Sequence, residues 1–541
     1  MNRRGIAFLV MVLPLLLLAA CDRERGSSPP PRKGPGMPAY GDAIVAGSIG
    51  EPSTLIPILA TDSASSDISG LVYNGLVRYD KNLKLEGDLA ERWDISRDGL
   101  TITFHLRRGV KWHDGGEFTS RDVLYTYRVT IDPKTPTAYA DSFNQVLKAE
   151  APDDYTFRVT YARPFAPALE SWGMPVLPAH LLEGKDITKS PLSRNPVGTG
   201  PYIFRQWVAG QRVVLESNPN YYEGRPYIGR YIYKIIPDSS TMYMELKAGG
   251  IDQMGISPIQ YQRQTGTPEF ASKFNKYRYP AAAYTYLAYN LRNPLFADKR
   301  VRQALTSAIN KEEIIHGVLL GMGQVAHGPF KPGTWAYNPG VRDFGYSPER
   351  ARALLAEAGW RERDRDGILV KNGKQFRFTI LTNQGNDQRL KSAVIIQYRL
   401  KAIGIDVKIR VIEWASFLSQ FIDKGNFDAV LLGWTITPDP DIFDIWHSSK
   451  TGPKEFNFIR YMNPAVDRLL EQGRGTFDME ERKRCYFRLQ EILAEDQPYT
   501  FLYVPDTLPV VSARFRGIEP APAGIGHNFI KWYVPKEEQR Y

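Results

Sequence analysis

Apolar and polar residues alternate along several short stretches of the first third of the chain, and this period of two predicts half-buried strands. The clearest stretch, residues 100–106, reads L-T-I-T-F-H-L, and residues 43–49 and 156–161 are assigned in the same way. Thr119 and Asp122 stand at the spacing of a capping box before an apolar run, which predicts the start of a helix. We therefore expect short strands and helices in alternation from residue 43 onward.

A longer unit lies between residues 375 and 434 and predicts a parallel sheet. In chain order its elements are strand 376–381, helix 387–403, strand 405–412, helix 415–424 and strand 427–434. The last strand, F-D-A-V-L-L-G-W, is almost wholly apolar, as expected of a strand covered on both faces. The crossovers of such a β-α-β-α-β unit should be right-handed and its sheet parallel. Ligands of open α/β sheets bind beyond the carboxyl ends of the strands.

The segment that follows this last strand is the leading candidate for a binding loop. It reads T-I-T-P-D-P-D-I-F from Thr435 onward, so that Asp439 and Asp441 place two carboxylates at the predicted mouth of the sheet. Either carboxylate could bind a ligand. Either could equally cap the turn and the helix that follows it.

The N-terminus has the pattern of a targeting segment. Arg3 and Arg4 precede an apolar run, residues 6–20, that is too short for a membrane-spanning helix, and we interpret residues 1–20 as a signal peptide. The ending L-A-A-C resembles a lipobox, which implies cleavage before Cys21 and lipidation of its thiol. Residues 21–42 are rich in proline, serine and charge and predict a flexible tether. By the resemblance to bacterial lipoproteins, Asp22 implies retention on the periplasmic side of the inner membrane.

Composition excludes several function classes. A chain of 541 residues is too long for one core, so roughly two or three domains are expected. Its formal charge of +10 comes from basic residues interspersed with acidic ones, and no nucleic-acid partner is expected. Two cysteines and seven histidines without ligand spacing predict no metal site and no cofactor. The sequence has no P-loop, H-E-x-x-H, C-x-x-C, G-x-S-x-G or G-x-G-x-x-G motif, so we expect no enzyme.

A series of motifs together resembles one protein family. Residues 90–101, A-E-R-W-D-I-S-R-D-G-L-T, continue through F-H-L-R-R-G-V-K-W-H-D-G to F-T-S-R-D-V at 118–123. Further matches occupy residues 195–202, 218–222, 299–304, 351–359 and 428–434, the last followed by D-P-D at 439–441. In this order, over about residues 43 to 510, the series is similar to the extracellular solute-binding proteins of family 5. These are dipeptide- and oligopeptide-binding receptors of ABC importers.

The resemblance implies an α/β fold, the class II periplasmic binding protein, with two lobes and an extra subdomain in lobe one. On this chain lobe one would comprise residues 43–279 and a return at 503–541, and lobe two would comprise 280–502. The chain would cross twice between the lobes, which makes a hinge that can close on a ligand.

The implied function is capture of di- or oligopeptides in a cleft between the lobes and delivery to an ABC permease with its ATPase subunits. We expect a monomer that is held at the membrane by its lipid anchor. The alternatives are the same role for a non-peptide cargo, such as a sugar oligomer or a metal chelate, and, less favoured, a hydrolase.

The resemblance also implies which residues contact the ligand. In similar receptors, backbone donors come from segments that match Gly433, Trp434 and Thr435, and Ser63, Ala64, Ser65 and Ser66. Related peptide receptors place an aspartate shortly after the first of these segments, where it pairs with the α-amino group of the ligand. Here Ile436 and Thr437 occupy those positions. Either Asp439 or Asp441 supplies the acid, or the cargo needs no free amino terminus.

Overall fold

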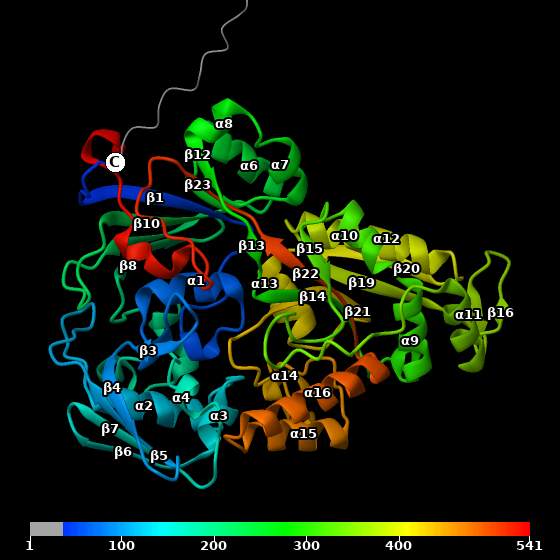
Figure 1. Ribbon diagram of the computed structural model, residues 1–541, viewed down its shortest axis with the longest axis horizontal. Coiled ribbons are helices and arrows are strands. Elements are labelled where there is room, and N and C mark those ends of the chain that lie inside the picture. The colour runs from blue at the N-terminus through cyan, green and yellow to red at the C-terminus, as the bar shows by residue number, and fades with distance from the viewer. Residues whose placement is uncertain (1–35) are drawn as a thin grey trace, which may run out of the picture.

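The computed structural model describes residues 36–541, which form two lobes, each built around a mixed seven-stranded sheet (Figure 1). In spatial order the first sheet contains β12 (Phe274–Lys276), β23 (Pro509–Ser512), β11 (Gln253–Gly255), β1 (Gly41–Ser48), β10 (Ile228–Ile235), β9 (Arg212–Ser217) and β8 (Tyr202–Val208). Its helices are α1 (Ser63–Val72), α5 (Ala179–Leu182), α6 (Ser239–Ala248), α7 (Pro258–Arg263) and α8 (Pro268–Lys273). This α/β architecture confirms the predicted fold class.

An extra subdomain belongs to the first lobe. Its antiparallel sheet has the order β4 (Ala90–Ile95), β5 (Thr101–Leu106), β7 (Thr156–Tyr161) and β6 (Val146–Asp153). The ribbon β2 (Val77–Tyr79) and β3 (Leu85–Gly87) and the helices α2 (Ser120–Ile131), α3 (Ala140–Asn144) and α4 (Ala168–Ser171) complete it. Buried and less buried side chains alternate along β5 and β7, as predicted, and Thr119 and Asp122 form the predicted capping box of α2.

The second sheet is the centre of the second lobe. Its spatial order is β13 (Tyr279–Pro280), β22 (Tyr499–Thr507), β14 (Ala283–Tyr289), β21 (Ala429–Thr435), β19 (Arg377–Asn383) and β20 (Asp406–Ile412), with β15 (Gly323–Val325) also paired to β22. A small ribbon of β16 (Glu362–Arg363), β17 (Leu369–Lys371) and β18 (Lys374–Gln375) lies apart from it. Strand β19 pairs in parallel with both β20 and β21, which confirms the predicted β-α-β-α-β unit.

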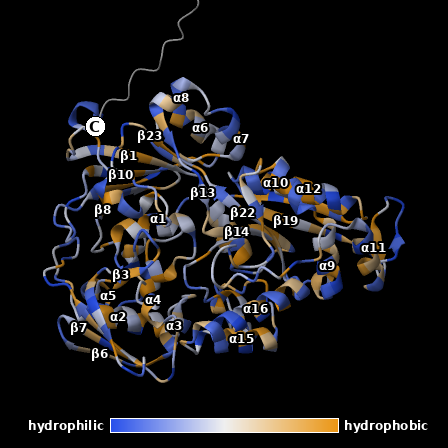
Figure 2. Ribbon diagram, in the orientation of Figure 1, coloured by the Kyte–Doolittle hydropathy of each residue, from blue (hydrophilic) through white to orange (hydrophobic). Residues whose placement is uncertain are grey.

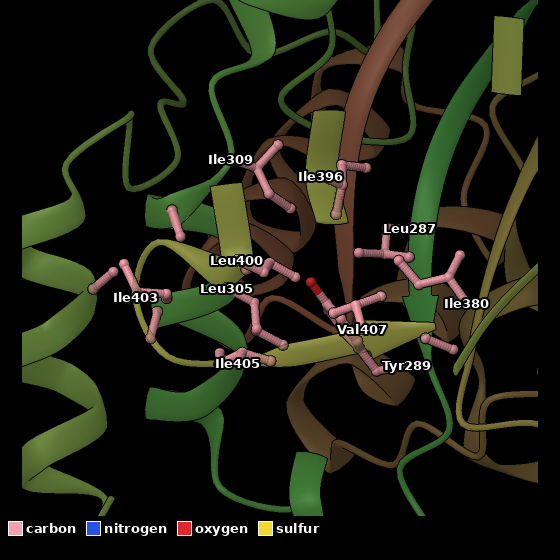
Figure 3. Close-up of a cluster of buried hydrophobic side chains, with 14 of the residues drawn as sticks. Leu287, Tyr289, Leu305, Ile309, Ile380, Ile396, Leu400, Ile403, Ile405 and Val407 are labelled. Carbon is pink, nitrogen blue, oxygen red and sulfur yellow. The ribbon is translucent and has the colours of Figure 1, made fainter. Parts of the chain in front are cut away.

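Eight helices of the second lobe are α9 (Lys299–Ala308), α10 (Lys311–Gly317), α11 (Pro348–Glu357), α12 (Asp387–Lys401), α13 (Trp414–Ser416), α14 (Phe443–Trp446), α15 (Pro464–Arg474) and α16 (Met479–Asp496). Ile396 and Leu400 of α12 lie on one face and pack with Leu287 of β14 and Ile380 of β19, all with no exposed surface (Figure 3). Hydrophobic residues are frequent along the central strands, such as β19, and the helices at the periphery, such as α15 and α16, mix hydrophobic with hydrophilic residues (Figure 2).

Two elements differ from their prediction in instructive ways. Residues 43–46 of β1 are all buried instead of alternating, because β1 lies inside the sheet between β10 and β11. The strand also starts at Gly41, so Asp42, which was expected in the tether, is buried and paired with Arg514. The predicted helix 415–424 is a short α-turn followed by a π-helical turn, Phe417–Ile422.

The chain passes between the two sheets twice, at neighbouring places. Strand β12 ends at Lys276 and β13 begins at Tyr279, while β22 ends at Thr507 and β23 begins at Pro509. The Tyr277 N–H donates to the Pro509 carbonyl at 3.0 Å, so the two crossings lie side by side. The predicted division at 502–503 falls inside β22, which stays in the second sheet to Thr507.

The expected signal peptide, Cys21 and most of the tether lie outside the described residues. Across residues 36–541, no helix combines the length and the apolar character needed to span a membrane.

Candidate functional site between the lobes

The two lobes contact each other on the side away from the crossings, where α15 approaches α3 (Figure 1). The Arg474 guanidinium forms ion pairs with Asp141 of the first lobe and with Asp441 of the second, where Nη2 lies 2.6 Å from Oδ2. Lys450 adds a second contact with Asp141, at 3.4 Å. The Ala166 N–H also donates to the Arg474 carbonyl at 2.8 Å. These contacts join the two lobes on the side opposite the crossings.

Strand β21 brings Gly433, Trp434 and Thr435 to this interface with one backbone edge open. Ile436 donates to the Ala282 carbonyl at 2.8 Å, which marks the even-numbered residues of β21 as the ones hydrogen-bonded to β14. The N–H and C=O groups of Gly433 and Thr435 therefore point to the opposite edge. The neighbour on that side, β19, pairs with β21 only as far as Leu381↔Val430. An extended ligand could pair with the backbone that remains.

Gly433 is a glycine because two groups approach it too closely for a side chain. A Cβ atom at this position would lie 2.9 Å from Nη2 of Arg389 and 2.9 Å from the carbonyl oxygen of Tyr284. Heavy atoms at this separation clash, so a substitution would displace Arg389 or the strand.

Aromatic side chains from both lobes meet beside this edge. Trp434 donates from Nε1 to the Tyr499 hydroxyl at 3.3 Å and lies edge-on to Phe456, with ring centroids 5.4 Å apart. The ring of Phe456 in turn packs edge-on against that of Tyr139 of the first lobe, with centroids 5.6 Å apart. The wall that these rings form is apolar, so it can contact a ligand without selecting for charge.

The loop after β21 uses its two aspartates inside the protein. Asp439 accepts from Nη2 of Arg482 at 2.8 and 2.9 Å, and Asp441 pairs with Arg474. Asp439 also accepts from the Asp441 N–H at 2.9 Å, and Asp441 accepts from the Phe443 N–H at 3.3 Å, where α14 begins. Both carboxylates thus shape the turn and already have a cationic partner.

Ile436 and Thr437, the two residues in place of an expected acid, offer no charge. Ile436 packs against the apolar cluster of the second lobe. The Thr437 hydroxyl donates to the carbonyl of Asp439 at 2.7 Å.

The other predicted ligand segment forms the first turn of α1. Asp62 accepts from the N–H and the hydroxyl of Ser65 at 2.9 and 2.7 Å, and the Ser53 N–H donates to that hydroxyl at 3.0 Å. Ala64 and Ser65 are buried, whereas Ser63 and Ser66 are exposed. Both the N–H and the hydroxyl of Ser66 donate to the Asp62 carbonyl at 3.1 Å, so the exposed surface of this segment at Ser66 has no free donor.

Tyr139 lies between the two predicted segments, with its hydroxyl hydrogen-bonded to the Ala60 carbonyl before α1 and its ring against Phe456, which contacts Trp434. Its pKa is raised mainly by burial, and then by the charges of Asp444 in the second lobe and Asp62 at the start of α1. Its hydroxyl donates to the Ala60 carbonyl at 2.7 Å. The two segments thus lie on opposite sides of one interface, with Tyr139 between them.

Several functional candidates carry no local sequence signal. Asp141, Glu170, Arg389, Arg474 and Arg482 sit in ordinary helical stretches. Only the tertiary arrangement brings Asp141 to Arg474, Glu170 near Asp439 and Arg482, and Arg389 to Gly433. Burial raises the pKa of Glu170 to about 7, assisted by the charge of Asp439 across the interface. Among residues 36–541, no three His, Cys, Asp or Glu side chains are grouped so that they could hold a metal ion.

Comparison with known proteins places this arrangement in a family. Residues 84–455 match the model of bacterial extracellular solute-binding proteins, family 5 Middle. The oligopeptide-binding protein AppA of Bacillus subtilis is 36% identical over 99% of this chain and 100% of its own length. The solved structure of AppA in complex with a nonapeptide has a TM-score of 0.88 and 35% identity, and covers 92% of this chain and 100% of that one.

Other relatives are named for different cargoes. Heme-binding protein A of Haemophilus influenzae is 30% identical over 96% of this chain and 97% of its own length. The structure of NikZ from Campylobacter jejuni in complex with Ni(L-His) has a TM-score of 0.83 and 30% identity, and covers 91% of this chain and 99% of that one. On a family model matched over residues 84–455 and a 36% identical relative covered along its whole length, this chain belongs to the bacterial extracellular solute-binding proteins of family 5.

Proposed function

We propose that this protein is the peptide-binding receptor of an ABC importer. The observation that carries the proposal is the open backbone edge of β21 at Gly433 and Thr435, which lies where the two lobes meet. The likeness to AppA, which was solved with a nonapeptide, supports it. The receptor would hand its cargo to a permease with ATPase subunits.

Peptide binding follows from the chemistry of that edge. Every residue of an extended peptide carries an unpaired N–H and C=O, whatever its side chain. Pairing them with β21 adds a strand to the second sheet and recognises length and extension instead of sequence. The aromatic wall at Trp434 and Phe456 adds apolar contact for varied side chains.

Closure would complete the binding site. The adjacent crossings at Tyr277 and Leu508 would act as the hinge, and the pairing of Asp141 with Arg474 and Lys450 would stabilise the closed state. A ligand that binds only the closed state shifts the population towards it. Binding and closure are then one event, and no covalent step is needed.

Attachment to the cell envelope belongs to the same proposal. Cys21 would carry a lipid, and residues 22–40 would link it to β1, which starts at Gly41. We place the receptor as a monomer on the periplasmic side of the inner membrane. A Cys21→Ala variant should then be released from membranes by salt, and extraction that still needs detergent would contradict the anchor.

The cargo can be identified on the protein itself. Mass spectrometry of natively purified receptor should detect bound peptides, and calorimetry with a defined peptide should give saturable binding of an unchanged ligand. A bound sugar oligomer or metal chelate, with no peptide affinity, would replace peptide as the cargo. Recovery of cleaved peptide would instead favour a hydrolase.

N-methylated peptides would test the backbone mode directly. Methylating one peptide nitrogen at a time removes one donor without changing charge. Affinity should fall at alternate positions along the ligand, because only every second residue of an added strand faces β21. Equal tolerance at every position would contradict strand addition.

A further inference from the structure

One cation beside the open edge of β21 has no charged partner. Arg389 is the third residue of α12, directly after β19, and its guanidinium lies over Gly433. Nη1 donates to the Asn383 side chain at 2.8 Å. Within residues 36–541, no carboxylate lies within ion-pairing distance of Arg389, and its buried Nε has no hydrogen-bond acceptor.

This isolation is costly for a charged group. Burial lowers the pKa of Arg389, although the neighbouring tyrosines Tyr503 and Tyr286 oppose that shift. A guanidinium that leaves water loses solvation, which only a paired anion and hydrogen bonds restore. A neutral amide oxygen on one of its nitrogens is a weak substitute.

Two buried arginines at the lobe interface, unlike Arg389, have charged partners. Arg474 is paired with two aspartates and Arg482 with one. A buried arginine elsewhere in the fold, Arg302, has no counter-charge in the described part of the chain, but backbone carbonyl oxygens accept from each of its three nitrogens. Arg474 and Arg482 have carboxylate partners, and Arg389 has neither a carboxylate nor a full set of acceptors. Arg389 has no counter-charge, and it lies next to the backbone that would pair with a ligand.

On the basis of the proposed function, we propose that Arg389 binds a carboxylate group of the peptide ligand. The planar guanidinium can donate two parallel hydrogen bonds to a carboxylate, a geometry that lysine cannot offer. Nη2 projects to the Gly433 end of the open edge, where a ligand strand would pass, and the Thr285 hydroxyl lies beside the same glycine. The carboxylate comes from the C-terminus of the peptide or from an acidic side chain.

Calorimetry with matched peptides tests this without any mutation. The first pair is a peptide without acidic side chains, as the free acid and as the C-terminal amide. The second pair is the amide with one glutamate or glutamine at each position in turn. Wild-type protein should prefer the carboxylate form in one of the pairs by tenfold or more, about 1.4 kcal/mol. The pair that shows the preference identifies the source of the carboxylate.

Variants assign the preference to Arg389. Arg389→Met should abolish the discrimination, and Arg389→Lys, which keeps the charge without the fork, should retain part of it. Lys391→Met is the matched control, since Lys391 lies on the same helix with its side chain 54% exposed. It removes the same charge and should leave the preference intact. If Arg389→Met is too unstable to purify, Arg389→Gln replaces it.

The outcomes separate this inference from the proposed function. Wild-type protein that binds no peptide at all contradicts the receptor proposal. Wild-type protein that binds acid and neutral peptides equally well leaves the receptor intact and overturns the role of Arg389. A preference that survives in Arg389→Met overturns it as well.

Discussion

The loop after β21 and the open backbone edge of the same strand differ in whether the charged side chains beside them are paired. In the loop after the strand, Asp439 and Asp441 are each paired with an arginine, and both also hold the backbone of the turn. Beside the strand itself, Arg389 has no charged partner and the backbone edge is open. The carboxylates of the loop thus have partners within the protein, whereas among the described residues the Arg389 guanidinium has no counter-charge and the backbone edge has no neighbouring strand.

The difference indicates which polar groups are available for a ligand. Removing one partner of a buried ion pair destabilises the fold, because the remaining charge is left uncompensated. A polar group that the fold leaves without a partner gains one only when something binds. Asp439 and Asp441 already have arginine partners, so Arg389, which has none, is the stronger candidate for binding a charged group of the ligand.

The largest expected effect concerns the paired charges, in particular the ion pairs of Arg474. Arg474→Met should lower the free energy of unfolding by about 3–5 kcal/mol, because it leaves the half-buried Asp441 without its cation and Asp141 with Lys450 alone. Denaturant unfolding measures the loss. Arg468→Met, an exposed arginine of the same helix, should change stability by less than about 0.5 kcal/mol. Similar losses in both variants would show that the pairing is not important.

The next effect concerns the open edge. Gly433→Ala should cost about 1–3 kcal/mol of stability and abolish peptide binding, because the new Cβ meets Arg389 and the Tyr284 carbonyl. Gly255→Ala is the control, since a Cβ in that strand of the first lobe meets open space. Calorimetry and thermal melts on both variants separate binding from folding. Full peptide affinity in Gly433→Ala would contradict the proposed position of the ligand.

A smaller effect concerns the pH dependence of closure. Burial raises the pKa of Glu170 to about 7 in the closed state, and the charge of Asp439 adds to the rise. Closure then favours the protonated acid, so affinity should fall as pH rises from the ordinary glutamate range through 7. From pH 6 to 8 this carboxyl should weaken binding about tenfold.

Glu170→Gln should remove that part of the pH dependence. Asp444, whose pKa burial also raises to about 7, would still contribute its own share. Glu91→Gln, on the exposed strand β4, should leave the profile unchanged. Calorimetry at several pH values measures the slope, and an unchanged slope in Glu170→Gln would show that this carboxyl does not titrate on closure.

The smallest expected effect is on the ligand's amino terminus. Ile436 and Thr437 carry no charge, and both aspartates of the loop are already paired, so no acid of this loop is free for an α-ammonium group. Peptides with free and acetylated amino termini should therefore bind within about tenfold of each other, a difference of about 1.4 kcal/mol. A much stronger preference for the free amine would mean that one of these aspartates changes partner when ligand binds, and an asparagine at that position would then remove the preference.

Local patterns in the sequence determined the elements and the order of the parallel unit. The alternation in residues 101–106, the capping box at Thr119 and the apolar strand 429–434 each depend on neighbours within a few residues, and all are present in the structure. The family motifs also predict that a ligand-binding segment lies at the end of β21. These features are readable because backbone geometry relates periodicity directly to burial.

Only the tertiary structure decided which charges are paired. Arg474 meets Asp141, and Asp42 meets Arg514, across hundreds of residues, so no local pattern could assign these partners. The same distance left residues 43–46 of β1 all buried, since its neighbours β10 and β11 come from far along the chain. Burial and pairing are properties of the assembled lobes, and the free energy of a charged group depends on both. For that reason the sequence alone predicted Asp439 and Asp441 as candidate ligand residues, and only the contacts in the fold indicated Arg389.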